Sequence, residues 1–297
     1  MTVEEATARY LPFMDGAYRM AMGLLPLAAS DWIEIDDYFR AQLAEKRRLL
    51  AAHPDEIVIA LPSAQDAARE LLDVLASHLC AIHGDRFRRD GAMIVAVAAG
   101  ERWNVADPDR HPLELCGRLV QEDFCLLQPD GARHSLVGAS LCFPSKWRLA
   151  DKIGRDIATV HGPVPGYADK LERPVDRFFD ALKPDKLVWR LNWLIHDDPA
   201  LFQQGGGAPA TRRIAAEDAG EALWLRVERQ TLRRLPRTAA IVFTIRTHVT
   251  PLGRAITTPE AAQALASAVK TMSPDVLAYR HMGHFVAPLL AWLEARS

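Results

Sequence analysis

Residues 222–230, Ala-Leu-Trp-Leu-Arg-Val-Glu-Arg-Gln, alternate apolar and polar side chains and carry the clearest strand pattern of the chain. Successive side chains of a strand point to opposite faces. One face therefore carries Leu223, Leu225 and Val227, and the other carries Trp224, Arg226, Glu228 and Gln230. Residues 186–196 and 239–250 alternate in the same way. Long alternating strands joined by turns predict an antiparallel sheet with one apolar face.

Helical patterns flank these strands on both sides. We predict helices over residues 31–50, with Asp31 as cap, and over 63–83, and two more over 259–272 and 274–295. Shorter strands are expected at 92–99 and 134–143. The order helices, strands, helices indicates an α+β fold. We expect a single domain, 1–297, divided into a helical region (1–90), a sheet core (91–255) and C-terminal helices (256–297).

Composition restricts the classes of protein. The chain has 297 residues, 49% of them hydrophobic and 25% charged, as in an ordinary globular protein. The 36 basic and 38 acidic residues nearly cancel, which argues against nucleic acid or an anionic membrane as a partner. The acidic amino terminus does not resemble a signal peptide and no apolar run has membrane-spanning length, so we expect a cytoplasmic protein. The glycine-rich stretch 205–209 is expected to be a loop.

Several cofactor motifs are missing from the sequence. The four cysteines are far apart and form no C-x-x-C pair, which excludes a zinc ribbon and the common clustered iron–sulfur motifs. We expect reduced, mostly buried thiols. There is also no G-x-G-x-x-G or Walker sequence between a strand and a helix. The chain is therefore not expected to bind NAD or ATP by itself.

The most specific segment for chemistry is 141–167, in which His161 precedes Pro163 and Pro165. Two prolines restrict the backbone, which suits a side chain that must be held in one position, such as a ligand of a metal or of haem iron. A turn histidine beside two helix-stopping prolines is the plainer interpretation.

Other polar residues also allow two interpretations. Arg226 and Glu228 share a strand face with Trp224, where they could hold an anion and an ammonium ion or could form a surface ion pair. Arg246 and His248 present the same choice. His281 and His284, three residues apart in a predicted helix, are compatible with a metal, but no third ligand is evident nearby.

The sequence resembles the family of haem-dependent oxidative N-demethylases, in particular the haem-binding α-subunit and its relatives. The segments that carry the resemblance are 10–24 (Tyr-Leu-Pro-Phe-Met-Asp-Gly-Ala-Tyr-Arg-Met-Ala-Met-Gly-Leu), 32–38, 143–167, 190–193 (Arg-Leu-Asn-Trp), 226–236 and 241–247. They are collinear and extend over nearly the whole chain.

The resemblance implies a PAS-like antiparallel sheet with N- and C-terminal helical additions that holds haem b. It implies oxygen as co-substrate, a small secondary or tertiary methylamine as substrate, and formaldehyde as a product. Electrons would come from NADPH through FMN and 2Fe–2S partner proteins, a reductase or ferredoxin. A non-catalytic haem-binding PAS-like gas or redox sensor, or a haem-free structural relative, is the alternative.

Within the resemblance, His161 is expected to be the axial ligand of the haem iron, with His196, His248 and the His281/His284 pair as competitors. Glu228 is expected to hold the ammonium substrate. Trp224, Arg226 and Arg229 are expected to contact the cofactor, although alternation places Arg226 and Arg229 on opposite faces of one strand. The aromatic residues Tyr10, Phe13 and Trp32 are expected to be packing residues that seat the amino-terminal helices on the sheet.

Overall fold

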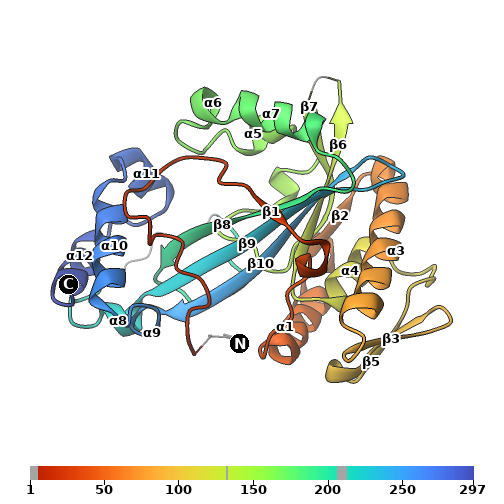
Figure 1. Ribbon diagram of the computed structural model, residues 1–297, viewed down its shortest axis with the longest axis horizontal. Coiled ribbons are helices and arrows are strands. Elements are labelled where there is room, and N and C mark those ends of the chain that lie inside the picture. Colours follow the sequence, from red (N-terminus) through yellow and green to blue (C-terminus); the bar gives the residue numbers. More distant parts are fainter. Residues whose placement is uncertain (1–5, 132, 206–212) are drawn as a thin grey trace.

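The structure is a computed structural model of the chain and describes residues 6–131, 133–205 and 213–297. Its centre is a seven-stranded antiparallel sheet, so the predicted α+β fold is confirmed (Figure 1). In spatial order the strands are β1 (Leu25–Leu27), β8 (Leu187–His196), β9 (Trp224–Arg234), β10 (Ile241–Pro251), β6 (Asp123–Asp130), β7 (Arg133–Ser140) and β2 (Val58–Ala60). The three predicted long strands are β8, β9 and β10, side by side in the sheet. The two short strands β1 and β2 come from the first 90 residues.

Both faces of the sheet are covered, which differs from the prediction of a single apolar face. The strand register puts Asn192 opposite Glu228, and Arg229 opposite Arg246. We name the two sides the Glu228 face, which also carries Asn192 and Arg226, and the Arg229 face, which also carries Arg246 and His248. Charged side chains are buried on both of them.

Different helices cover the two faces, as Figure 1 shows. The Glu228 face packs against η4 (Leu149–Asp151), α5 (Ile157–Val160), α6 (Tyr167–Lys170) and α7 (Glu172–Ala181). One end of the Arg229 face packs against α1 (Phe39–Ala52), α3 (Gln65–Ile82) and α4 (Pro112–Leu119). The other end packs against α8 (Ala219–Ala222), α9 (Leu252–Ala255), α10 (Pro259–Lys270), α11 (Pro274–Tyr279) and α12 (Val286–Glu294).

A small second sheet lies beside α3. It contains β3 (Phe87–Asp90), β4 (Met93–Ala96) and β5 (Glu101–Asn104), so the predicted strand 92–99 belongs to it and ends early, in η3 (Val97–Ala99). The remaining short elements are η1 (Ala29–Asp31), α2 (Pro54–Ile57) and η2 (Pro62–Ala64). In the described part of the chain, no helix combines the length and the apolar character needed to cross a membrane.

The helix predicted from Asp31 is wrong at its start, because α1 begins only at Phe39. The backbone N–H of Glu34 donates to Glu122 Oε1 at 2.8 Å, and that of Tyr38 donates to Asp36 Oδ1 at 2.9 Å. These bonds fix an irregular segment on the sheet in place of a first helical turn. The predicted helix over 63–83 is confirmed as α3.

The predicted last helix, 274–295, is divided into α11 and α12. Arg280 donates from Nη1 to the backbone oxygen of Trp193 at 2.6 Å, and His281 adopts a left-handed φ of 56°. Both His281 and His284 lie in the break between the two helices, so they do not share a helical face. His284 instead places Nε2 at 2.8 Å from Asp197 Oδ2.

The close approach of α8 and α12 gives a prediction for stability. A Cβ at Gly220 would lie 2.8 Å from Cζ2 of the buried Trp292 ring, so Gly220→Ala overpacks this contact. We expect the free energy of unfolding, measured by urea denaturation, to fall by about 1–3 kcal/mol. Gly283→Ala is the control, because a Cβ there meets nothing within 4 Å. Equal stability of the two variants would contradict the predicted overpacking.

Candidate functional site

A polar group of side chains lies where β8 and β9 meet on the Glu228 face. Asn192 Nδ2 and Gln230 Nε2 both donate to Glu228 Oε2, at 3.3 and 2.9 Å. The other carboxylate oxygen, Oε1, lies 3.9 Å from Arg226 Nε. Glu228 is only 7% exposed. Two amides therefore fix one oxygen of a buried carboxylate and leave the other without a close donor among the described residues.

Arg190 lies on the same face, two residues before Asn192, and is half-buried. Its Nε is buried and has no hydrogen-bond partner in the described part of the structure. Burial lowers the pKa of Arg190, and the charge of Glu228 opposes this effect. A buried guanidinium N–H without a partner is costly, so Arg190 is suited to meet an anionic group.

His161 follows α5 and belongs to the segment that covers the Glu228 face. Its Nδ1 lies 2.9 Å from the backbone oxygen of Ile157, and its ring stacks on Tyr167 at a centroid distance of 4.7 Å. A carbonyl oxygen can only accept a hydrogen bond, so Nδ1 carries the proton and Nε2 carries the lone pair. This is the tautomer in which an imidazole binds a metal through Nε2.

Electrostatics connect His161 with the residues on the strands. Burial lowers the pKa of His161, the bond to Ile157 raises it, and the charges of Lys152 and Arg190 lower it. The ring is therefore kept neutral, as a metal ligand must be. The charge of Arg190 therefore acts on His161, and that of Glu228 acts on Arg190.

The predicted cofactor contacts Arg226 and Trp224 lie at the far end of the same face. Arg226, 1% exposed, donates to the backbone oxygens of Phe143 at 2.7 Å and of Leu201 at 3.3 Å. It thereby holds two loops on the sheet. Trp224 packs with Phe143 and Leu201 in one buried cluster. His196, opposite Trp224, is buried there, and burial together with the charge of Arg226 puts its pKa well below the usual value.

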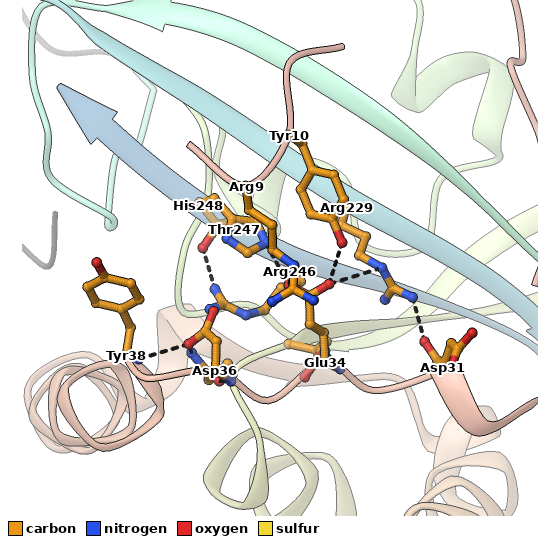
Figure 2. A network of polar contacts seen from close by, with 12 residues as sticks. Arg9, Tyr10, Asp31, Glu34, Asp36, Tyr38, Arg229, Arg246, Thr247 and His248 are labelled. Carbon is orange, nitrogen blue, oxygen red and sulfur yellow. Dashed lines mark hydrogen bonds and ion pairs between the residues drawn. The ribbon is translucent and has the colours of Figure 1, made fainter. Parts of the chain in front are cut away.

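Arg229 lies on the opposite face, as alternation predicts, in the network drawn in Figure 2. Glu34 is the centre of this network. Its carboxylate accepts from the Tyr10 hydroxyl at 2.5 Å and lies 3.1 Å from His248 Nε2, 3.4 Å from Arg9 Nε and 3.5 Å from Arg229 Nε. The network holds the amino-terminal segment on the Arg229 face.

The same network contains a possible metal-ligand set. Ligand atoms of Glu34, Asp36 and His248 lie within 4.8 Å of one another. However, Arg246 forms an ion pair with Asp36, and Arg9 and Arg229 lie beside Glu34. Three guanidinium groups already neutralise the two carboxylates, so a divalent cation would be repelled. The arrangement is a network of ion pairs that holds the amino-terminal segment on the sheet.

Sequence reasoning missed two members of the site. Arg190 and Asn192 share the polar face of residues 186–196 and belong to a segment that carries the family resemblance, but neither was assigned a role. The signal that could have found them is cross-strand pairing, because Asn192 lies directly opposite Glu228. That pairing depends on the register of β8 and β9, which alternation alone does not supply.

The structure defines an antiparallel α+β protein in which a neutral histidine and a buried carboxylate lie on the same side of the sheet, between sheet and helices. The family model described as "Haem-dependent oxidative N-demethylase, alpha subunit-like" matches residues 23–290. The chain belongs to this family, and the resemblance found in the sequence is confirmed.

Two residues offer groups of the kind needed to hold the haem that the family name implies. His161 offers the Nε2 lone pair that an iron ligand needs, and Arg190 offers an unpaired donor for a carboxylate such as a haem propionate. Both lie on the Glu228 face or in the segment that covers it.

The Glu34 network gives a prediction of pH-dependent stability. Burial raises the pKa of Glu34, but the hydrogen bond and charge of His248, with Tyr10 and Arg9, lower it to about 2. A carboxylate with a depressed pKa stabilises the fold above its unfolded pKa and loses that contribution as the pH falls through the folded value. The lost contribution is about 3 kcal/mol between pH 5 and pH 2.

We therefore expect the free energy of unfolding of the wild type to fall more steeply over this interval than that of Glu34→Gln, measured by urea denaturation at each pH. The exposed Glu217→Gln is the control and should follow the wild type. Parallel curves for all three proteins would remove the stabilising role of the Glu34 carboxylate.

Proposed function

We propose that this chain binds haem b on the Glu228 face, with His161 as axial ligand, and removes a methyl group from a small secondary or tertiary methylamine with oxygen. The observation that carries the proposal is the hydrogen bond from His161 Nδ1 to the Ile157 carbonyl. It leaves Nε2 as the ligand atom, in a chain of the haem-dependent N-demethylase family.

When bound, the haem would supply the activation of oxygen. The chain's own residues do the rest. His161 would ligate the iron, and the Arg190 guanidinium would bind a propionate. We assign this contact to Arg190 in place of Arg226 and Arg229, because Arg226 donates to backbone oxygens and Arg229 lies on the opposite face. Arg226 contributes by fixing the loop at Phe143, and Trp224 by packing against the same loop.

Glu228 is proposed to bind the substrate. A small alkylamine is an ammonium ion near neutral pH and needs a carboxylate partner in a buried site. Asn192 and Gln230 both occupy Oε2, so Oε1 is the atom that accepts the substrate N–H. The two amides position the carboxylate, and the methyl groups of the amine are then held at a fixed place on the Glu228 face.

The reaction balances with two electrons from outside the chain. One methylamine, one oxygen molecule, two electrons and two protons give the demethylated amine, formaldehyde and water. The sequence has no dinucleotide-binding motif and no clustered cysteines for an iron–sulfur centre, so a partner reductase must supply the electrons. We propose NADPH as their source, through FMN and 2Fe–2S partner proteins.

His161→Ala tests the axial ligand. Purified wild-type protein reconstituted with haemin should give a Soret spectrum of histidine ligation, whereas His161→Ala should bind haemin at least about tenfold more weakly, because the iron–imidazole bond is lost. Added imidazole should restore the spectrum. His53→Ala, a half-exposed histidine that stacks on Phe202, is the control. Unchanged ligation in His161→Ala would reject the assignment and leave His196 as the next candidate.

Glu228→Gln tests the amine site. Dimethylammonium added to the haemin-loaded wild type should shift the Soret band. In Glu228→Gln the dissociation constant for this shift should rise about 10- to 100-fold, because a charge-assisted hydrogen bond is lost, while haemin affinity is kept. The exposed Glu221→Gln is the control. An unchanged dissociation constant would remove the role of Glu228, and a wild-type spectrum that ignores methylamines would favour a gas or redox sensor.

A further inference from the structure

One edge of β8 is open beside the candidate site. β1 pairs with β8 only from Leu187 to Trp189, and within the described residues no strand continues this pairing along 190–196. Arg190, Asn192 and Leu194 on this stretch are half-buried, whereas the facing residues of β9 are mostly buried. The Glu228 face is therefore accessible from the β8 edge.

The chain that precedes β1, Gly16–Gly23, crosses this opening. Figure 1 shows it passing from the C-terminal helices α10 and α11 to the side of α5 and α6. At one end the Tyr18 backbone N–H donates to Thr271 Oγ1 at 2.8 Å. At the other end Met20 lies against the turn before α6, where a Cβ at Gly166 would be 3.6 Å from the Met20 sulfur. We call this segment the strap.

Two glycines explain why the strap leaves β8. Gly16 and Gly23 have φ of 84° and 60°, values that L side chains rarely adopt. Continuing the β1 register would place Met20 opposite Leu194. The turns at the two glycines direct the chain away from that pairing. Between them, burial alternates: Tyr18, Met20 and Met22 are half-buried and the residues between them are exposed. The strap is an extended segment with one inward side.

Tyr18 fastens the strap to the protein. Its ring lies over the Arg280 guanidinium, with Arg280 Cζ 5.0 Å from the ring centroid. Arg280 also lies 5.3 Å from the Trp193 ring and donates to the Trp193 backbone oxygen on the β8 edge. Burial lowers the pKa of Arg190, and the charges of Glu228 and Tyr18 raise it. The Tyr18 side chain therefore lies at the edge of the candidate site.

We propose that the strap Gly16–Gly23 is the movable outer wall of the site on the Glu228 face, and that Tyr18 is the positioning residue that holds it closed. The identity of the ligand behind the wall rests on the proposed function. The wall itself is a property of the protein without ligand, so it can be tested separately.

The test uses two glycines with the same backbone conformation. Gly23 and Gly91, in the β3–β4 turn, have φ of 60° and 59°, and a Cβ at either meets nothing within 4 Å. Alanine strains both turns equally, but only Gly23→Ala disturbs the strap. Leu194→Cys is introduced as a probe behind the wall, and its labelling by a maleimide is measured in the protein without haem, with labelling of the parent protein subtracted.

We expect the probe to react about tenfold faster in Gly23→Ala and in Tyr18→Ala than in Gly91→Ala, because the strained or unfastened strap opens more often. Haemin uptake, followed at the Soret band, should accelerate in the same two variants. Equal labelling rates in Gly23→Ala, Tyr18→Ala and Gly91→Ala would overturn the proposal. If Gly23→Ala and Tyr18→Ala label faster than Gly91→Ala but the wild-type protein binds no haemin, the movable wall is supported and the proposed function is rejected.

Discussion

The constraint on which the structure depends is the burial of charged residues on both faces of β9. Neighbouring residues of a strand point in opposite directions, so Glu228 and Arg229 are only one residue apart but lie in different environments. Each buried charge needs partners, because a buried charge without a partner destabilises the folded state by roughly several kcal/mol. Backbone oxygens hold Arg226, amides hold Glu228, and Glu34 with two backbone oxygens holds Arg229. The loops and the amino-terminal segment are positioned by these requirements.

This constraint also explains which parts of the fold the sequence could predict. The strands β8, β9 and β10 follow from a period of two, because polar and apolar residues alternate along each of them. β6 could not be found in this way: its residues 123–127 are buried on both sides, so Asp-Phe-Cys-Leu-Leu carries no alternation. The false helix start at Asp31 has a different cause. Residues 31–38 have helical spacing, but Glu122, 88 residues after Glu34, takes its backbone N–H. A local sequence pattern gives no signal for a contact between residues so far apart in the chain.

For the candidate site, too, the sequence could predict only what local patterns contain. A strand face and a proline-bounded turn, both local signals, made Glu228 and His161 candidates, and the family resemblance supplied their expected roles. Arg190 and Asn192 needed the register of two strands whose intervening chain includes residues outside the described ones. The role of Arg226 needed more still, because its partners are carbonyl oxygens at Phe143 and Leu201, and backbone oxygens have no sequence signal.

The two faces of β9 differ in how completely their polar groups are paired. On the Arg229 face, guanidinium groups pair with the carboxylates of Glu34 and Asp36, and such a cluster repels a divalent cation. Among the described residues, the Glu228 face keeps an Arg190 N–H without a hydrogen-bond partner, a Glu228 oxygen that lies 3.9 Å from Arg226 Nε, and the Nε2 lone pair of His161. Arg226 links this face to the histidine-bearing segment, because it grips the loop at Phe143 from which the chain continues to His161. The strand that carries the substrate carboxylate in our proposal therefore also anchors the loop from which the chain continues to His161.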